Sequence, residues 1–236
     1  MKNLKILWLV TARSGSKSIP DKNIKLLDGQ PLLSYRIKSA SQTSYPNSIW
    51  ISTDSDKYAQ IAKSFGAEVK FKRPNYLSKD NSSSVDVVLH AMNYAEINNY
   101  KFNFIGLLEP TSPFITTSQL DQALSKLANE EDARSIVAVI KHRPNTIFVQ
   151  DESPYLDTLS KKLNRIKKMG RQEFKNQITP SGGFYIAKWD TFLEDKSFYT
   201  DKTLSFLVDE ISGLEIDEPI DFSFAEFIVK NYDLNK

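Results

Sequence analysis

The chain has no cysteine, which excludes a disulfide framework and a cysteine-based metal site. It also lacks long apolar runs: Ile6–Val10 is too short for the core of a signal peptide, and no stretch approaches the ~20 apolar residues that span a bilayer. The formal net charge is only +2, which argues against general nucleic-acid binding. We therefore expect a soluble, cytoplasmic protein with neither a membrane nor a nucleic acid as a partner.

The composition that remains is that of a globular protein with a core, because 40% of the 236 residues are hydrophobic and 25% are charged. The charges are unevenly spread. Lysine and arginine predominate in residues 1–40, whereas residues 201–226 are rich in aspartate and glutamate. These two ends could meet at one site that binds a polyanion and a metal ion, or both could be solvated surface.

Apolar, β-branched runs alternate with longer amphipathic stretches. The runs predict strands at residues 4–10, 48–53, 67–71, 102–108, 135–140 and 182–186. The stretches predict helices at residues 31–43, 57–65, 84–97, 118–127 and 220–229. This alternation indicates an α/β fold with a mostly parallel sheet, helices on both faces and ligands beyond the carboxyl ends of the strands. Residues 142–176 break the pattern, and we interpret them as a flap or an oligomer arm of a single domain, 1–236.

The loop after the first predicted strand has the composition of an anion-binding loop. Residues 11–23 read TARSGSKSIPDKN, with small residues around Gly15 and three cations, Arg13, Lys17 and Lys22. Small residues let backbone N–H groups turn toward an anion, and a triphosphate is the obvious ligand. The loop matches neither the Walker A pattern nor GxGxxG, and taken alone it could be an ordinary basic surface loop.

Residues 12–24, ARSGSKSIPDKNI, closely resemble the A-R-x-G-S-K-x-I-P-x-K-N loop of the CMP-sialic acid synthetases (acylneuraminate cytidylyltransferases) and of their relatives that activate legionaminic and pseudaminic acids. The loop of the Kdo cytidylyltransferases fits less well. The resemblance implies a Rossmann-like, three-layer α/β/α nucleotidyltransferase fold and a homodimer with a protruding dimerisation arm at 142–176. It also implies that Arg13 and Lys22 contact the triphosphate, while Ser16 and Asn23 hold the nucleotide.

Two further segments would complete the nucleotide site. The serine-rich turn LSKDNSSS (77–84) resembles the family segment beside the cytosine and ribose, so Ser82 and Ser83 could read the base or simply cap the next helix. Arg73 could contact the nucleotide or pair with an acid. Asp54, after the second predicted strand, is expected to shape a turn or to cap a helix.

The segment LLEPTSP (107–113) resembles the family's L-Q-P-T-S-P, which faces the acceptor sugar and here would contribute Glu109, Thr111 and Ser112. Glu109 replaces the usual glutamine. An ionised carboxylate accepts hydrogen bonds but does not donate them, and it repels a sugar carboxylate. A protonated Glu109 or an altered sugar substituent would reconcile the substitution with the activity.

The remaining acceptor contacts also come from the resemblance. Arg171 and Gln172 match the family's R-Q-[EQ] stretch, whose arginine contacts the sugar acid in its own or in the neighbouring subunit's site, and a guanidinium suits a carboxylate. Arg143 could take over an anionic contact, because Thr146 stands where relatives often have lysine. Tyr185 follows a variant of N-G-A-I-Y-I in which Ser181 replaces asparagine; it lines the sugar pocket or belongs to the core.

The acidic segment LEIDEPID (214–221) resembles the family's D-I-D-x-x-x-D. In an extended chain Glu215 and Asp217 project to the same side, and their oxygens suit Mg²⁺ or Mn²⁺. Glu218 and Asp221 fit the first turn of a helix instead, where the helix dipole favours acids.

These matches predict an enzyme that couples CTP to an acidic, sialic-acid-like sugar with release of pyrophosphate. Arg13, Lys22 and Asp217 are the expected catalytic residues, and no residue stands out as a general base. Two alternatives stay open. The chain could use another nucleotide or a sugar 1-phosphate on the same fold, or it could bind nucleotide without turnover.

Overall fold

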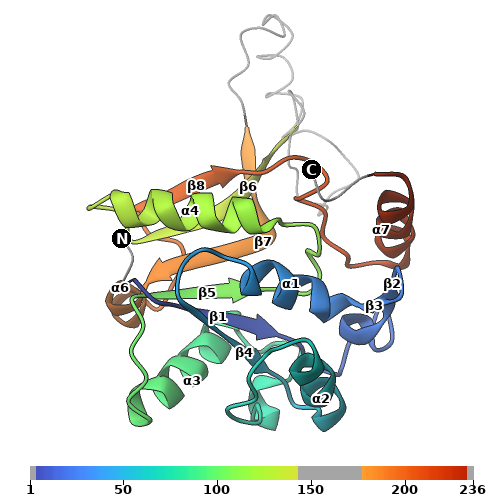
Figure 1. Ribbon diagram of the computed structural model, residues 1–236, viewed down its shortest axis with the longest axis horizontal. Coiled ribbons are helices and arrows are strands. Elements are labelled where there is room, and N and C mark those ends of the chain that lie inside the picture. The colour runs from blue at the N-terminus through green and yellow to red at the C-terminus, as the bar shows by residue number, and fades with distance from the viewer. Residues whose placement is uncertain (1–3, 143–176, 233–236) are drawn as a thin grey trace, which may run out of the picture.

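The computed structural model describes residues 4–142 and 177–232, which form a central six-stranded sheet with helices on both faces (Figure 1). The strands are β1 (Ile6–Thr11), β4 (Asn47–Ser52), β5 (Phe104–Leu108), β6 (Ser135–Lys141), β7 (Ile178–Lys188) and β8 (Thr203–Leu207). Their order in the sheet is β4-β1-β5-β7-β6-β8. β7 runs antiparallel to β5 and β6, whereas the other neighbouring pairs are parallel. The predicted α/β fold with a mostly parallel sheet is confirmed.

Six helices complete the three layers in the described part of the chain. They are α1 (Leu32–Ser41), α2 (Asp56–Ser64), α3 (Ser84–Ile97), α4 (Thr117–Asn129), α6 (Trp189–Asp195) and α7 (Pro219–Asn231). α1, α2 and α4 share one hydrophobic cluster with the sheet, and α3 and α6 share another on the opposite face. α7 lies at one end of the molecule beside the short hairpin of β2 (Leu26–Leu27) and β3 (Gln30–Pro31) (Figure 1). Short 3-10 turns occupy Lys22–Ile24 and Asn75–Leu77.

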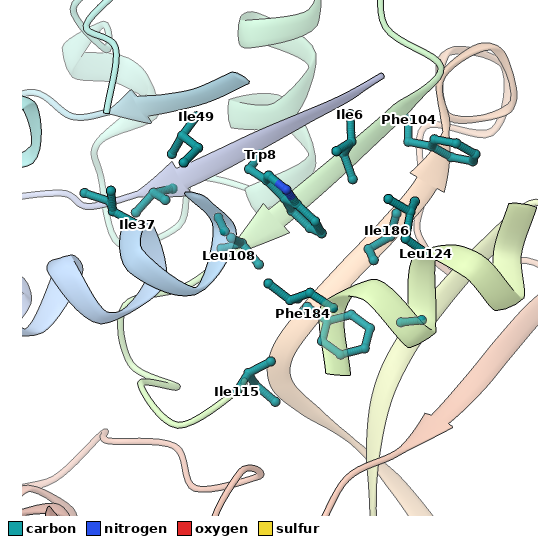
Figure 2. Close-up of a cluster of buried hydrophobic side chains, with 14 of the residues drawn as sticks. Ile6, Trp8, Ile37, Ile49, Phe104, Leu108, Ile115, Leu124, Phe184 and Ile186 are labelled. Atoms are coloured by element: carbon teal, nitrogen blue, oxygen red, sulfur yellow. The ribbon is translucent and has the colours of Figure 1, made fainter. Parts of the chain in front are cut away.

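Successive side chains of β1 point to opposite faces of the sheet, and helices cover both faces. Trp8 belongs to the cluster on the α1 side, while its neighbours Leu7 and Leu9 belong to the cluster on the α3 side, and all three side chains are fully buried. Trp8 lies at the centre of its cluster (Figure 2). Its indole covers Gly106 on the adjacent strand so closely that a Cβ there would lie 2.3 Å from the ring. A glycine is therefore required at that position.

Most predicted elements exist, with boundaries displaced by a few residues. The strand predicted at 67–71 is wrong, because only an isolated parallel bridge joins Glu68 to Trp50 at the sheet edge. α6 and β8 were not predicted. The excursion predicted at 142–176 lies, apart from His142, outside the described residues. No helix in the described ranges is long and apolar enough to cross a membrane.

The carboxyl ends of β1, β4 and β5 meet at one edge of the sheet, where many of the predicted site residues gather. Because β7 runs in the opposite direction, it carries its early residues, including Gly182, to this same edge. The segment before α7 crosses there too: the backbone N–H of Ile216 donates to the carbonyl of Thr111 at 2.8 Å. Segments distant in sequence thus surround one site.

Candidate active site

A cavity of about 650 Å³ opens at the carboxyl edge of the sheet. Ten predicted site residues line it: Arg13, Ser16, Lys22, Asn23, Arg73, Ser82, Glu109, Thr111, Glu215 and Asp217. Its lining also includes Thr11, Lys17, Ser18, Leu77, Lys79, Asp80, Ser84, Val87, Pro110 and Glu218. The basic loop and the acidic segment therefore face one space, as the charge distribution suggested.

The loop after β1 is fixed from two sides. Within it, the Nδ2 of the buried Asn23 donates to the carbonyl of Arg13 at 3.0 Å. Asp54, at the end of β4, accepts hydrogen bonds from both the backbone N–H and the hydroxyl of Ser14, each at 2.9 Å. Of the two roles expected for Asp54, shaping a turn or capping a helix, the second is wrong, because Ser55 is the residue that caps α2. Asp54 instead fixes the loop after β1 through Ser14.

Each cation of the loop meets an acid from another segment. Asp80, which precedes α3, pairs with the Arg13 guanidinium at 2.5 Å and with Lys17. These two partners hold the pKa of Asp80 below its usual range, with Lys17 contributing most. Lys22 reaches the opposite wall, where its ammonium donates to the Ile216 carbonyl at 2.8 Å and to Asp217 Oδ1 at 3.1 Å. Asp80 was not assigned a role from the sequence, although it is the one acid inside the predicted nucleotide segment 77–84.

Arg73 is only 4% exposed and is anchored to β4, because its Nε donates to the Ser52 hydroxyl at 3.0 Å and its Nη2 to the Ser52 carbonyl at 2.6 Å. Burial lowers its pKa to about 10, so the guanidinium stays charged at neutral pH. Arg73 therefore presents a fixed positive charge at the cavity wall without an acid at salt-bridge distance among the described residues.

The two predicted base-reading serines have different surroundings. The Ser82 hydroxyl lines the cavity while it donates to the Tyr76 carbonyl at 3.0 Å and accepts from the Lys79 N–H at 3.1 Å. Ser83 caps α3 by accepting from the Val85 N–H at 3.1 Å and does not line the cavity. The capping interpretation thus holds for Ser83.

The acidic wall is an extended segment, not a strand, yet its side chains alternate as predicted. Ile216 is fully buried, and its neighbours Glu215 and Asp217 both line the cavity. Glu215 packs against Gly182 so tightly that a Cβ on Gly182 would lie 2.0 Å from Glu215 Oε1. Burial raises the pKa of Glu215, and the N–H of Gly182 opposes this rise by donating to the carboxylate. Gly182 therefore fixes the position of the Glu215 carboxylate.

Glu218 and Asp221 form a capping box at the start of α7, where Asp221 lies in the first turn as predicted and Glu218 is the N-cap residue. Asp221 Oδ2 accepts from the backbone N–H groups of Asp217, at 3.0 Å, and Glu218, at 2.8 Å. The cap thereby fixes the backbone of Asp217. Glu218 also contributes to the cavity wall.

Glu109 follows β5 and is half-buried at the cavity wall. Burial raises its pKa to about 7, and the charges of Glu215 and Asp217 act in the same direction. Lys22 and Arg36 oppose the rise. Thr111 lines the cavity as expected.

Two predicted acceptor residues are not among those that line the cavity. Ser112 is fully buried behind Gly182, whose Cβ would lie 3.1 Å from the Ser112 hydroxyl. Tyr185 packs its ring 5.6 Å from that of Phe198 and 6.1 Å from that of Tyr199. Tyr185 is thus partly buried against the hydrophobic cluster on the α3 side, and its contact with a sugar stays a prediction. The predicted contacts Arg143, Arg171 and Gln172 lie outside the described residues.

Comparison with known proteins agrees with this geometry. A sequence model of the family described as cytidylyltransferase matches residues 7–232. An N-acylneuraminate cytidylyltransferase of Escherichia coli O18:K1:H7 is 31% identical over 94% of this chain, but the chain spans only 51% of that protein. A CMP-N,N'-diacetyllegionaminic acid synthase of Legionella pneumophila is 30% identical over 96% of this chain and 97% of its own length.

Solved structures show the same fold. A CMP:2-keto-3-deoxy-manno-octonic acid synthetase complexed with CTP superposes with a TM-score of 0.68 at 15% identity and covers 96% of this chain and 98% of its own. A 4-diphosphocytidyl-2C-methyl-D-erythritol synthase of Anaerococcus prevotii gives a TM-score of 0.62 at 13% identity, covering 97% and 99%. Together with the family match over nearly the whole chain, these likenesses establish that the chain belongs to the cytidylyltransferase family.

Proposed function

We propose that the chain transfers CMP from CTP to the anomeric hydroxyl of a sialic-acid-like (nonulosonic) sugar acid and releases pyrophosphate. The observation that carries this proposal is the cavity in which cations from the loop after β1 face the carboxylates Glu215 and Asp217. The names of the Escherichia coli and Legionella relatives support the choice of nucleotide and acceptor.

The two carboxylates fit Mg²⁺ or Mn²⁺ when the triphosphate is bound. Mg²⁺ in nucleotide sites is held by one or two carboxylates, and phosphate oxygens and water complete its shell. Within residues 4–142 and 177–232 no three His, Asp or Glu side chains are close enough to form a metal cage, so Glu215 and Asp217 would hold the ion only together with the nucleotide. When bound, the ion would neutralise phosphate charge and lower the pKa of a coordinated hydroxyl.

The loop side of the cavity would bind the nucleotide. Arg13 and Lys17 would exchange Asp80 for phosphate oxygens, and the fixed charge of Arg73 would add to the field. Lys22, which the Ile216 carbonyl holds in place, would exchange Asp217 for an oxygen of the α-phosphate, where negative charge accumulates during the reaction. Ser16, Asn23 and Ser82 would orient the ribose and base, with Ser83 acting only as a cap.

The chemical step would be an in-line displacement. The anomeric oxygen forms a bond to the α-phosphorus, the bond between that phosphorus and the α–β bridging oxygen breaks, and pyrophosphate leaves with the electron pair. The hydroxyl proton passes to water as the new bond forms. Positioning and charge stabilisation by Arg13, Lys22 and Asp217 would supply most of the rate enhancement.

The wall formed by Glu109 and Thr111 would receive the sugar. Arg171, Gln172 and Arg143 remain proposed contacts for the acidic sugar, and Ser112 and Tyr185 would support this wall from behind. We further propose a cytoplasmic homodimer in which residues 142–176 form the arm. Sizing the protein in solution tests this assembly, and a monomer at catalytic concentrations would contradict it.

The activity is tested by measuring pyrophosphate release with Mg²⁺ and CTP against sialic, legionaminic, pseudaminic and Kdo-type acids, with GTP in place of CTP as a control. We expect turnover of one of these acids with CTP and none with GTP. Turnover with GTP but not with CTP would show that the chain uses a different nucleotide. CTP binding without pyrophosphate release from any acid would overturn the proposal.

A further inference from the structure

The junction between β4 and α2 contacts the loop after β1 at two points. The first contact is near the beginning of the loop, where Asp54 binds Ser14. The second is near its end, where the hydroxyl of Tyr58, in the first turn of α2, donates to Asp21 Oδ1 at 2.9 Å. Asp21 directly precedes Lys22. The junction therefore holds the loop on both sides of its cations.

The backbone of Asp21 is in the left-handed region, with φ 53° and ψ 30°. Its carbonyl accepts from the N–H groups of Ile24 and Lys25, each at 3.0 Å, which closes the turn that carries Lys22. Few residues other than glycine adopt this region, although aspartate and asparagine do so more readily than most. Of the four described non-glycine residues with positive φ, Asp21 alone adjoins a residue of the cavity lining. Its conformation sets the direction in which the chain enters Lys22.

The Asp21 side chain is anchored to α2. It makes no capping bond to the turn that follows, and its second oxygen accepts from the Lys57 ammonium at 3.2 Å. Tyr58 is the stronger anchor, because it is only 1% exposed within the hydrophobic cluster on the α1 side. The Lys57 side chain is 64% exposed, and a surface ion pair of this kind contributes little. Tyr58 is also the main cause that holds the pKa of Asp21 below its usual range.

The other end of Lys22 is fixed as well. Its ammonium donates to the Ile216 carbonyl at 2.8 Å. The lysine is thus held at its backbone through Asp21 and at its charge through Ile216. The proposed function needs this charge at the α-phosphate, and a small displacement of a catalytic group costs a large factor in rate.

We propose that Tyr58 and Asp21 are positioning residues for the transfer reaction. The Tyr58 hydroxyl holds the Asp21 carboxylate, and Asp21 holds the backbone that presents Lys22 to the α-phosphate. Neither Tyr58 nor Asp21 lines the cavity, so both act through Lys22. This inference rests on the proposed function and assigns part of its rate enhancement to residues outside the cavity.

Tyr58→Phe tests the anchor, because it removes one oxygen atom and leaves the buried ring in place. It should lower kcat for pyrophosphate release about tenfold, the scale expected when a catalytic group is misplaced by a fraction of an ångström. KM for CTP should change less, because Arg13, Lys17 and Arg73 also contribute to triphosphate binding in the proposed function.

Tyr100→Phe is the matched control. The Tyr100 hydroxyl accepts from the Lys70 ammonium at 3.1 Å, so this variant also loses a hydrogen bond to a charged group, but Tyr100 is outside the cavity lining. It should keep the native kcat. Thermal unfolding of both variants separates a loss of stability from a loss of rate, and an equal loss of kcat in both would overturn the inference.

A Lys22→Met background separates positioning from general support of the fold. If Tyr58 acts through Lys22, Tyr58→Phe should lower kcat no further once that lysine is absent. The same further loss of kcat as in the native background would show that Tyr58 affects the site by another route, and the positioning role would be wrong.

Three variants of Asp21 separate its conformation from its hydrogen bond. Asp21→Asn keeps a residue that tolerates the left-handed region and an oxygen that accepts from Tyr58, so kcat should stay near the native value. Asp21→Gly keeps the conformation but loses the acceptor, and its kcat should match that of Tyr58→Phe. Asp21→Ala loses both and should be at least as slow.

The outcomes distinguish this inference from the proposed function. Native kcat in both Tyr58→Phe and Asp21→Gly would overturn the positioning role alone, because the native protein would still turn over. If the native protein releases no pyrophosphate with any acceptor, the proposed function fails, and the positioning role fails with it.

Discussion

Lys22 and Asp217 are 195 residues apart in the chain, and their side chains meet across the cavity at 3.1 Å. The Lys22 side chain is 12% exposed and also donates to the Ile216 carbonyl, whereas the Asp217 side chain is 70% exposed. The ammonium is therefore the fixed member of the pair and the carboxylate the more accessible one. This asymmetry suits a lysine that remains in the site while Asp217 takes a metal ion.

Replacement of either residue should abolish most of the activity. Lys22→Met and Asp217→Asn should each lower kcat by about 100-fold or more, the size of effect seen when a charge-stabilising group is removed from a transition state. CTP binding should weaken far less in Asp217→Asn than turnover does. Steady-state pyrophosphate release and calorimetric CTP binding measure both quantities, and wild-type kcat in Asp217→Asn would exclude its proposed metal role.

Asp80 should compete with the triphosphate for Arg13 and Lys17. Asp80→Asn should tighten CTP binding about two- to fivefold at low ionic strength, because it removes the acid that occupies both cations. The gain should shrink as salt screens the charges. Asp132→Asn, which removes an exposed acid outside the cavity lining, is the matched control. Weaker binding in Asp80→Asn would mean that Asp80 orients the cations for the nucleotide instead.

Periodicity and loop composition predicted the sheet, most helices and the loop after β1, because these depend on local pattern. They could not predict the environment of Asp54, since its bonds to Ser14 depend on two strands that are adjacent only after folding. The same is true of Arg36, because no local pattern indicates that this arginine is buried and donates to the Gly183 carbonyl of β7. The prediction of a strand at 67–71 was wrong because this segment lies beside the edge strand β4, and its position there outweighs its β propensity.

The close contact between Gly182 and Glu215 allows a second test of whether the acidic segment holds the metal ion. Gly182→Ala would place a Cβ 2.0 Å from Glu215 Oε1, so the carboxylate must move. We expect the Mg²⁺ concentration for half-maximal activity to rise several-fold, with CTP affinity in the absence of metal little changed. A metal titration of pyrophosphate release measures this. The same metal dependence in Gly182→Ala as in the native protein would remove Glu215 from the proposed ligand pair.

The ionisation of Glu109 should make the free energy of unfolding depend on pH. Its pKa is raised from 4.5 to about 7 in the folded chain, so folding favours the protonated form. The contribution is fully present below about pH 4.5 and is lost as the pH rises through 7. Glu109→Gln has no such loss, so its free energy of unfolding relative to that of the native protein should rise by about 3 kcal/mol between pH 4.5 and pH 8.

Denaturant unfolding of both proteins without metal, across this pH range, measures the difference directly. The exposed Glu210→Gln should show no such trend. A flat difference for Glu109→Gln would mean that Glu109 ionises in the folded protein as it does in water. Its surroundings would then be open enough to hydrate the carboxylate. The pH trend therefore reports on the environment of Glu109 independently of any substrate.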